Sequence, residues 1–342
     1  MFFRCFEPPY ELDLESGQRL GPINLAYETY GKLDHSKSNA ILVCHALSGD
    51  AKVTDWWGAY VGPNKAIDTN RYFVICINTI GSCYGSTGPT SVDPKTGKPY
   101  GTTFPVITVT DMVRSQKALI DHLGISRLKA VIGASMGGMQ ALEWAIHYPD
   151  QVAACVPIAT SAYLAPQALA FNAVGRFAIT SDRNIGLSIA RMIGHITYLS
   201  NESIALKFGR RLQKKEHYSY DFSEEFEIES YLKYQGDKFV NRFDPDTYLY
   251  LSKAMSYFDL VKEYGSLKKA FGKVQAKFLV MSISSDWIYP SKQSKEIVKT
   301  LMNLNKEVTY CELDSPYGHD AFLLENDQLS GVIANFLENS HA

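Results

Sequence analysis

The chain has 342 residues and a nearly balanced charge, with 34 Lys and Arg against 36 Asp and Glu, a formal net charge of −2. Hydrophobic residues make up 46% and charged residues 20%, the range of folded globular proteins, which excludes a disordered or fibrous chain. The charge balance argues against nucleic acid as the main partner, and no apolar run approaches the roughly 20 residues of a membrane-spanning helix.

The cysteines and the first residues indicate a cytoplasmic protein. The segment 1–10 contains charges and prolines but no long apolar stretch, so it does not predict a signal peptide. The six cysteines are scattered and have neither C-x-x-C nor zinc spacing, which favours free thiols in a reducing compartment: Cys5, Cys44, Cys76, Cys83, Cys155 and Cys311.

Up to residue 160, apolar runs alternate with amphipathic stretches. Short continuous apolar runs predict strands buried on both faces, at residues 40–44, 72–77, 128–132 and 152–158. Apolar residues at helical spacing predict helices over 111–123, ended by Gly124, and over 136–147. Strands that alternate with helices are typical of a parallel sheet with crossover helices.

The alternation stops between residues 161 and 265 and then resumes. The intervening segment shows only amphipathic helical stretches, such as 186–198 and 245–258. Beyond it we expect strands at 277–282 and 308–312, and helices at 292–304 and 321–337. We therefore predict an α/β core formed by residues 1–160 and 266–342, with a helical lid inserted at 161–265. Such sheets carry their active sites at the carboxyl ends of the strands, so the lid is expected to cover the site.

Ser135 is the candidate nucleophile. It lies in Gly133-Ala-Ser-Met-Gly137, a G-x-S-x-G motif directly after a predicted strand and directly before a predicted helix. Glycines at these places permit a sharp turn that exposes the serine hydroxyl, and the following helix N-terminus favours a developing oxyanion. The string alone is a weak signal, but the strand–turn–helix context favours a nucleophile over a merely tight turn.

A serine nucleophile needs a base and an acid that orients the base. In this architecture the chain order is Ser, acid, His. Asp286 follows the predicted strand at 277–282, and His319 lies between the last predicted strand and the last predicted helix. Asp314 is the rival acid, but it lies too close to the end of the predicted strand at 308–312, the strand that precedes His319. Asp286 and His319 are therefore the predicted partners of Ser135.

The oxyanion hole needs two backbone N–H groups. One is expected from Met136, which follows the nucleophile, and the second from Leu47, in the loop His45-Ala-Leu-Ser-Gly49 after an early strand. For His45 itself, a hydrogen-bonding role that shapes the loop is favoured over a catalytic one.

Seven stretches spread over nearly the whole chain resemble homoserine O-acetyltransferases. They begin at the loop after the first predicted strand and end around His319, and comprise residues 45–50, 81–89, 101–105, 111–114, 133–144, 190–198 and 318–323. Together these stretches are far more specific than the G-x-S-x-G motif. Two places depart from the family pattern: Ala134 stands where Gly is common, and the segment 181–186 is abbreviated.

The resemblance implies an α/β-hydrolase fold with a helical lid, a homodimer, and acyl transfer from acyl-CoA to the hydroxyl of homoserine in methionine biosynthesis. It assigns the triad to Ser135, Asp286 and His319. It further implies substrate contacts by Arg191 and Tyr198 in the lid and by Asp320. For Arg191 the alternative is a solvated helix residue, and for Tyr198 a packing role.

Three other functions stay open at this stage. The same chemistry could use succinyl-CoA as the donor or serine as the acceptor, and a plain esterase or thioesterase would need only the triad. The third alternative, and the least favoured, is a protein that binds a partner and catalyses no reaction. The sequence has no metal-ligand pattern, P-loop or dinucleotide motif, so we expect no bound cofactor, with acyl-CoA as a co-substrate. The glycine-rich segment 81–88 is expected to shape a substrate channel.

Overall fold

A mixed eight-stranded sheet forms the centre of the protein. The computed structural model describes residues 1–213 and 216–340. The strand order is β1-β4-β8-β5-β9-β10-β11-β12. In this order, the six strands β8, β5, β9, β10, β11 and β12 pair in parallel with their neighbours. Strands β1 and β4 extend the sheet beyond β8 in antiparallel pairing. The sheet strands are β1 (Phe2–Cys5), β4 (Ile23–Tyr30), β5 (Ala40–Cys44), β8 (Phe73–Ile77), β9 (Ala130–Ala134), β10 (Ala154–Ile158), β11 (Lys277–Ile283) and β12 (Val308–Leu313).

The predicted α/β-hydrolase fold, with its mostly parallel sheet flanked by helices, is confirmed. One apolar core joins the sheet to α2, α3 and α11, and a second core on the opposite face joins it to α1 and α12. The covering helices are α1 (Val53–Trp57), α2 (Val109–His122), α3 (Met136–His147), α10 (Leu267–Ala270), α11 (Ser291–Asn303) and α12 (Asp327–Asn339), with short 3₁₀ turns η1 (Gly101–Thr103), η2 (Pro149–Gln151) and η3 (Gly318–Leu323).

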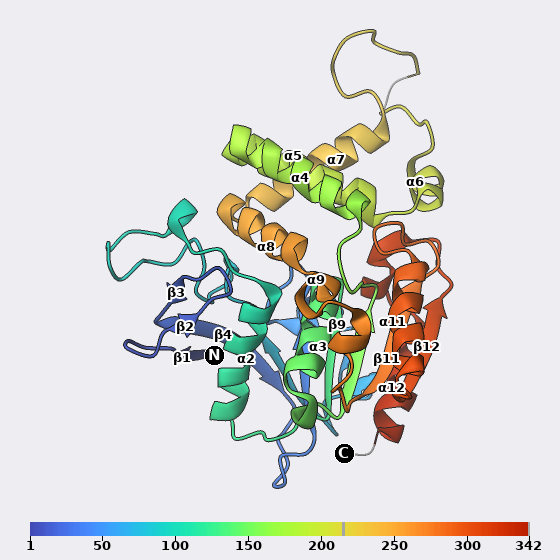
Figure 1. The fold of residues 1–342 in the computed structure, drawn as a ribbon. Coiled ribbons are helices and arrows are strands. Elements are labelled where there is room, and N and C mark those ends of the chain that lie inside the picture. The colour runs from blue at the N-terminus through green and yellow to red at the C-terminus, as the bar shows by residue number, and fades with distance from the viewer. Residues whose placement is uncertain (214–215, 341–342) are drawn as a thin grey trace.

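Helices occupy the stretch in which the strand–helix alternation stops. They are α4 (Pro166–Ser181), α5 (Arg183–Tyr198), α6 (Asn201–Phe208), α7 (Glu227–Val240), α8 (Pro245–Tyr257) and α9 (Leu260–Tyr264). Helices α4, α5, α7 and α8 form a layer beyond one end of the sheet (Figure 1). The two connections to this layer lie together, because Leu260 N–H donates to Ala162 O at 3.0 Å. The limits 161 and 265 of the insertion stay a prediction.

Several predicted elements differ from the structure at their ends, most of them by one to three residues, and two of the differences lie next to the site. Strand β9 runs to Ala134, two residues beyond the predicted end, and so leads directly into Ser135. The predicted helix 321–337 is instead the turn η3 followed by α12, which begins after Asn326. The side chain of Asn326 caps α12 by accepting from Leu329 N–H at 2.9 Å. The carbonyl of Phe322 accepts from Trp57 Nε1 at 2.9 Å, not from a following helical amide.

The first 30 residues and several helices gave no sequence prediction. The elements that were not predicted as such are the antiparallel strands β1 and β4, the two-stranded pairs β2 (Leu12–Asp13) with β3 (Arg19–Leu20) and β6 (Val61–Gly62) with β7 (Ile67–Asp68), and helices α1, α4, α6, α7, α9 and α10. Among the described residues, no helix is both long and apolar enough to cross a membrane.

Candidate active site

Ser135 occupies a strained turn between β9 and α3. Its backbone has φ 57° and ψ −123°, a region that non-glycine residues adopt at a cost of about 1–3 kcal/mol. The turn is held by Ser135 N–H, which donates to Ile158 O at 3.0 Å, and by Thr160 Oγ1, which donates to Ser135 O at 2.9 Å. Surrounding contacts therefore fix the backbone that presents the Ser135 hydroxyl.

The two motif glycines are required by close backbone approach. A Cβ atom on Gly133 would lie 2.1 Å from Gly137 O, and one on Gly137 would lie 2.0 Å from Cys44 O. Backbone atoms cannot move aside as a flexible side chain can. The G-x-S-x-G pattern thus reflects how tightly α3 packs against β5 and β9 at the turn.

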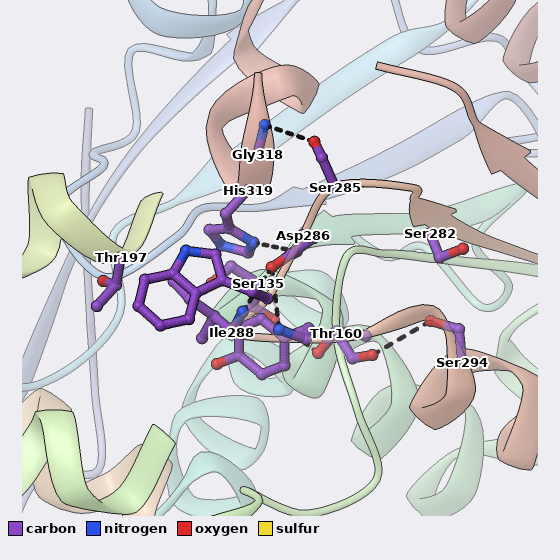
Figure 2. Close-up of polar contacts among 12 residues, drawn as sticks. Ser135, Thr160, Thr197, Ser282, Ser285, Asp286, Ile288, Ser294, Gly318 and His319 are labelled. Atoms are coloured by element: carbon purple, nitrogen blue, oxygen red, sulfur yellow. Dashed lines mark hydrogen bonds and ion pairs between the residues drawn. The ribbon is translucent and has the colours of Figure 1, made fainter. Parts of the chain in front are cut away.

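Asp286 and His319 form a buried pair. Asp286 Oδ2 lies 2.6 Å from His319 Nδ1, and Asp286 Oδ1 accepts from the N–H groups of Ile288 and Tyr289 at 2.9 and 3.0 Å. Figure 2 shows this pair with Ser135 close by, and a second link in which Gly318 N–H donates to Ser285 Oγ at 2.9 Å. Both loops are therefore held together, and the imidazole has one fixed orientation.

The surroundings of His319 favour its protonated form. Burial by itself lowers the pKa of this imidazole, but the charge and hydrogen bond of Asp286, together with the charge of Asp320, outweigh burial and raise the pKa above its ordinary value. An imidazole with this balance is well suited to accept a proton from a nearby hydroxyl and to release it later.

One cavity of about 330 Å³ brings together most of the predicted site. Its lining includes Leu47, Ser135, Arg191, Tyr198, His319 and Asp320. A smaller adjoining cavity shares Leu47, Ser135, Tyr198 and His319. Asp286 is buried behind His319 and takes no part in either lining. Residues that lie far apart in the sequence therefore meet at the carboxyl ends of the strands, below the helical layer.

The two predicted oxyanion donors are both available. Met136 is the first residue of α3, and Leu47 lies in the loop after β5. Among the described residues, neither backbone N–H donates a hydrogen bond. Such free amides beside a serine hydroxyl are the groups that stabilise a tetrahedral oxyanion.

His45 has the loop-shaping contacts that the sequence favoured. Thr79 N–H donates to His45 Nε2 at 3.1 Å, so the proton is assigned to Nδ1, which donates to Ala46 O at 2.8 Å. Burial lowers the pKa of His45 and keeps the imidazole neutral. Both ring nitrogens are used, so this side chain offers nothing to a substrate.

The helical layer contributes Arg191 and Tyr198 to the cavity, both from α5. The guanidinium of Arg191 lies over two rings, 5.8 Å from the centre of Tyr198 and 4.8 Å from that of Phe239. Gly194 allows the Tyr198 ring to approach, since a Cβ there would lie 2.9 Å from the ring. Among the described residues, the Arg191 guanidinium has neither a hydrogen bond nor an ion pair, so its donors remain open to an anionic ligand.

Asp320 places a carboxylate in the same cavity. Burial raises its pKa, an effect opposed by the charges of His319 and Arg191. No donor from the described residues bonds to it. A carboxylate and a guanidinium that face one cavity can together hold a ligand with an ammonium and a carboxylate group.

Arg242 and Trp56 also line this cavity and were not predicted. Arg242 lies just beyond the end of α7, in the short connection to α8. Neither residue stands in a pattern with a recognisable spacing, so only the folded chain brings them to the site. Tyr289, whose ring centre is 5.2 Å from that of His319, was missed for the same reason.

One group outside the cavity has ligand types that a metal could use. Donor atoms of Glu143, His147 and Glu263 lie within 4.8 Å of one another, with His147 Nε2 at 3.2 Å from Glu143 Oε2. The sequence predicted no metal. These side chains lie toward the end of α3 opposite to Ser135, and they also form an ordinary ion pair between Glu143 and His147, so they enter no catalytic step.

Comparison with known proteins gives consistent similarities. The family profile of the alpha/beta hydrolase fold matches residues 39–326. A homoserine O-acetyltransferase of Methanohalobium evestigatum is 55% identical over 99% of this chain and 73% of that protein. One from Solidesulfovibrio magneticus is 49% identical over 99% of this chain and 92% of that protein.

Solved structures show similarity to two kinds of enzyme. The crystal structure of homoserine O-acetyltransferase from Bacillus anthracis has a TM-score of 0.90 and 29% identity, covering 99% of this chain and 97% of that chain. The crystal structure of esterase E22 has a TM-score of 0.87 and 28% identity, covering 98% and 99%. The backbone arrangement is therefore shared by a transferase and a hydrolase, and side chains must distinguish them.

Proposed function

The chain belongs to the homoserine O-acetyltransferase family, and from this we propose that it transfers an acetyl group from acetyl-CoA to the hydroxyl of L-homoserine, a step of methionine biosynthesis. The observation that carries the proposal is the cavity that Ser135 and His319 line together with Arg191 and Asp320. A triad alone suits a hydrolase, but the added pair of opposite charges suits an amino-acid acceptor.

The first half-reaction forms an acetyl-enzyme. His319 Nε2 takes the proton of Ser135 Oγ, which attacks the carbonyl carbon of the thioester. The amides of Leu47 and Met136 stabilise the oxyanion, and the C–S bond breaks as His319 returns the proton to the sulfur of CoA. The hydrogen bond between His319 and Asp286, at 2.6 Å, stabilises the imidazolium that forms between these events.

The second half-reaction uses the same groups in reverse. With CoA gone, His319 takes the proton of the homoserine hydroxyl, whose oxygen attacks the acetyl-Ser135 carbonyl. The ester bond to Ser135 breaks, His319 protonates Ser135 Oγ, and O-acetylhomoserine leaves. Arg191 binds the carboxylate of homoserine and Asp320 its ammonium, while Tyr198 closes the cavity beside them. Acyl-CoA is a co-substrate in this scheme, and no bound cofactor takes part.

Acceptor binding is what separates transfer from hydrolysis. Water is present at far higher concentration than homoserine, but a bound and oriented hydroxyl can gain an effective molarity on the order of 10⁵ M. The helical layer over the cavity also limits access of water to the acetyl-enzyme. These two features support transfer over the esterase activity of the structural relatives.

CoA release tests the proposal directly. Purified enzyme is supplied with acetyl-CoA or succinyl-CoA, each with homoserine, with serine and with no acceptor. We expect fast release with acetyl-CoA and homoserine together and slow release otherwise. Equal release without an acceptor would identify a thioesterase. Parallel lines in double-reciprocal plots are expected for the two-step mechanism, and intersecting lines would contradict it.

We also propose that the protein is a homodimer that works in the cytoplasm. Helices α4 and α5 expose large apolar side chains, among them Val174, Phe177 and Ile185 at 51%, 71% and 63%. Clustered exposed apolar side chains are typical of an interface. The six cysteines are free thiols, as suits a reducing compartment. Sedimentation equilibrium should give twice the chain mass, and Phe177→Asp should yield monomers; a monomeric wild type would exclude the dimer.

A further inference from the structure

The loop that carries the Leu47 amide is anchored at its two ends. At its start, the ring of His45 accepts from Thr79 N–H at 3.1 Å. At its end, Asp50 O accepts from Trp56 Nε1 at 3.0 Å. Both anchors belong to the core of the protein. Between them Gly49 N–H donates to Ala46 O at 3.0 Å and closes a turn around Leu47 and Ser48, whose own N–H groups donate to no described residue.

The middle of this loop is held from the helical layer by Arg242. Arg242 Nη1 donates to Ser48 O at 3.3 Å, and among the described residues this is the one hydrogen bond made by Leu47 or Ser48. Ser48 O and Gly49 N–H belong to one peptide group, and Ala46 O and Leu47 N–H to another. The hydrogen bond from Gly49 N–H to Ala46 O joins these two groups, so a contact that holds Ser48 O also holds the Leu47 amide. The oxyanion loop and the end of α7 are thereby connected through a single side chain.

The guanidinium of Arg242 is itself fixed. Its Nη1 also donates to Tyr84 Oη at 2.8 Å, and its carbon lies 5.0 Å from the centre of the Phe239 ring. Tyr84 comes from the glycine-rich segment 81–88 and packs against Phe243, with ring centres 5.9 Å apart. A lid ring and a core hydroxyl thus orient Arg242 toward Ser48 before any substrate binds.

Arg242 differs in this respect from the other arginine of the cavity. Phe239 packs against both guanidinium groups, but Arg191 makes no hydrogen bond to a described residue, whereas Arg242 makes two. An open guanidinium is suited to bind a ligand, and an occupied one is suited to hold structure. The two arginines therefore serve different purposes in one cavity.

We infer that Arg242 is a positioning residue, which holds the Leu47 amide where the oxyanion forms and thus makes the oxyanion hole depend on the helical layer. The inference rests on the proposed function for the role of Leu47. An oxyanion donor must lie about 2.7–3.1 Å from the developing charge, and removal of one such donor costs on the order of 10²–10³ in rate. Release of the loop is expected to cost part of that factor.

The test measures acetylation of Ser135 in the full-length protein. Arg242→Gln, Arg242→Lys and Tyr84→Phe are compared with the wild type, using acetyl-CoA and two uncharged donors, p-nitrophenyl acetate and S-acetyl-N-acetylcysteamine. We expect Arg242→Gln to slow acetylation about tenfold or more with all three donors. Arg242→Lys, which keeps one donor for Ser48 O, should recover part of the rate, and Tyr84→Phe should have the smallest effect.

The matched control is Arg183→Gln, another lid arginine, which pairs with Asp246 away from the cavity. It should acetylate at the wild-type rate. Circular dichroism and the melting temperature establish that each variant is folded. The KM for homoserine should be unchanged in Arg242→Gln while kcat falls, a split that general loosening of the lid would not produce.

Two results would overturn the inference. If Arg242→Gln slows only the reaction of acetyl-CoA, Arg242 binds an anionic part of that donor and does not position the loop. If no donor is affected, the contact with Ser48 has no kinetic role. Acetylation by the uncharged donors needs no homoserine, so these outcomes stay separate from a failure of the proposed acceptor.

Discussion

Two sets of polar groups at the cavity are held in different ways. On the core side, every polar atom of Asp286 is used: Oδ2 contacts His319, and Oδ1 accepts two backbone N–H groups. Arg191, in α5 of the helical layer, and Asp320, next to His319 in η3, make no hydrogen bond with other described residues, and Arg191 lies against aromatic rings. Fixed groups and open groups thus line the same cavity.

The difference separates the two tasks of a transferase. Acyl chemistry needs a nucleophile, a base and oxyanion donors held in place before substrate arrives, because reorganisation during the reaction adds to the barrier. Acceptor recognition instead needs charges whose hydrogen-bonding capacity is completed by the ligand. We therefore expect changes of the fixed groups to abolish both transfer and hydrolysis, and changes of the open groups to affect transfer selectively.

The largest effect is expected from Ser135→Ala. Without the hydroxyl no acetyl-enzyme forms, so transfer to homoserine and hydrolysis of p-nitrophenyl acetate should both fall by on the order of 10⁴ or more. The rate of CoA release and mass spectrometry of the peptide that contains residue 135 measure this. CoA release should fall with transfer, and no acetylated peptide should appear. Retention of transfer would mean that homoserine attacks the thioester directly, without a covalent intermediate.

Asp286→Asn should come next. Asparagine has the same shape as aspartate, but it carries no charge and does not keep His319 in the required tautomer. Both activities should therefore fall by on the order of 10³–10⁴. The ratio of transfer to hydrolysis should stay near that of the wild type, measured with and without homoserine. A selective loss of transfer would place Asp286 with the acceptor-binding groups and would contradict the division into fixed and open groups.

Arg191→Ala is expected to have a smaller and selective effect. Loss of a charge-assisted hydrogen bond costs about 1.5–3 kcal/mol, which corresponds to roughly 10- to 100-fold in kcat/KM for homoserine. Hydrolysis of the acetyl-enzyme in the absence of an acceptor should change little. An equal loss of both activities would exclude Arg191 as the binder of the acceptor carboxylate.

The sequence predicted the core side of this cavity better than the lid side. The helix 136–147 was predicted with the limits that α3 has, because the turn glycines and the strand before Ser135 give strong local signals. The order Ser135, Asp286, His319 follows the chain order typical of this fold, and the structure brings Asp286 and His319 into contact. Local patterns suffice where a side chain sits at the end of a predicted element.

Residues that act through packing gave no such signal. Arg242 reaches Ser48 only because α7 lies across the cavity, and nothing in the sequence around Arg242 indicates where that helix packs. The antiparallel edge strands β1 and β4 were missed because neither lies in a strand–helix alternation. Arg191, Tyr198 and Asp320 came from the family resemblance, since their spacing alone does not predict one cavity.

The smallest effect tests how the open carboxylate of Asp320 acts on the fixed base. A raised pKa means that His319 keeps its proton to higher pH, and since the base must be neutral, the acidic limb of kcat/KM should lie above about 6.5. Asp320 contributes to this rise, so Asp320→Asn should move the limb to lower pH, measured with p-nitrophenyl acetate to avoid the acceptor. Asp286 remains the dominant charge on His319 in this variant, so the shift should be modest. If the limb does not move, or moves to higher pH, then Asp320 does not act electrostatically on the base, and the fixed and open groups of the cavity are independent of each other.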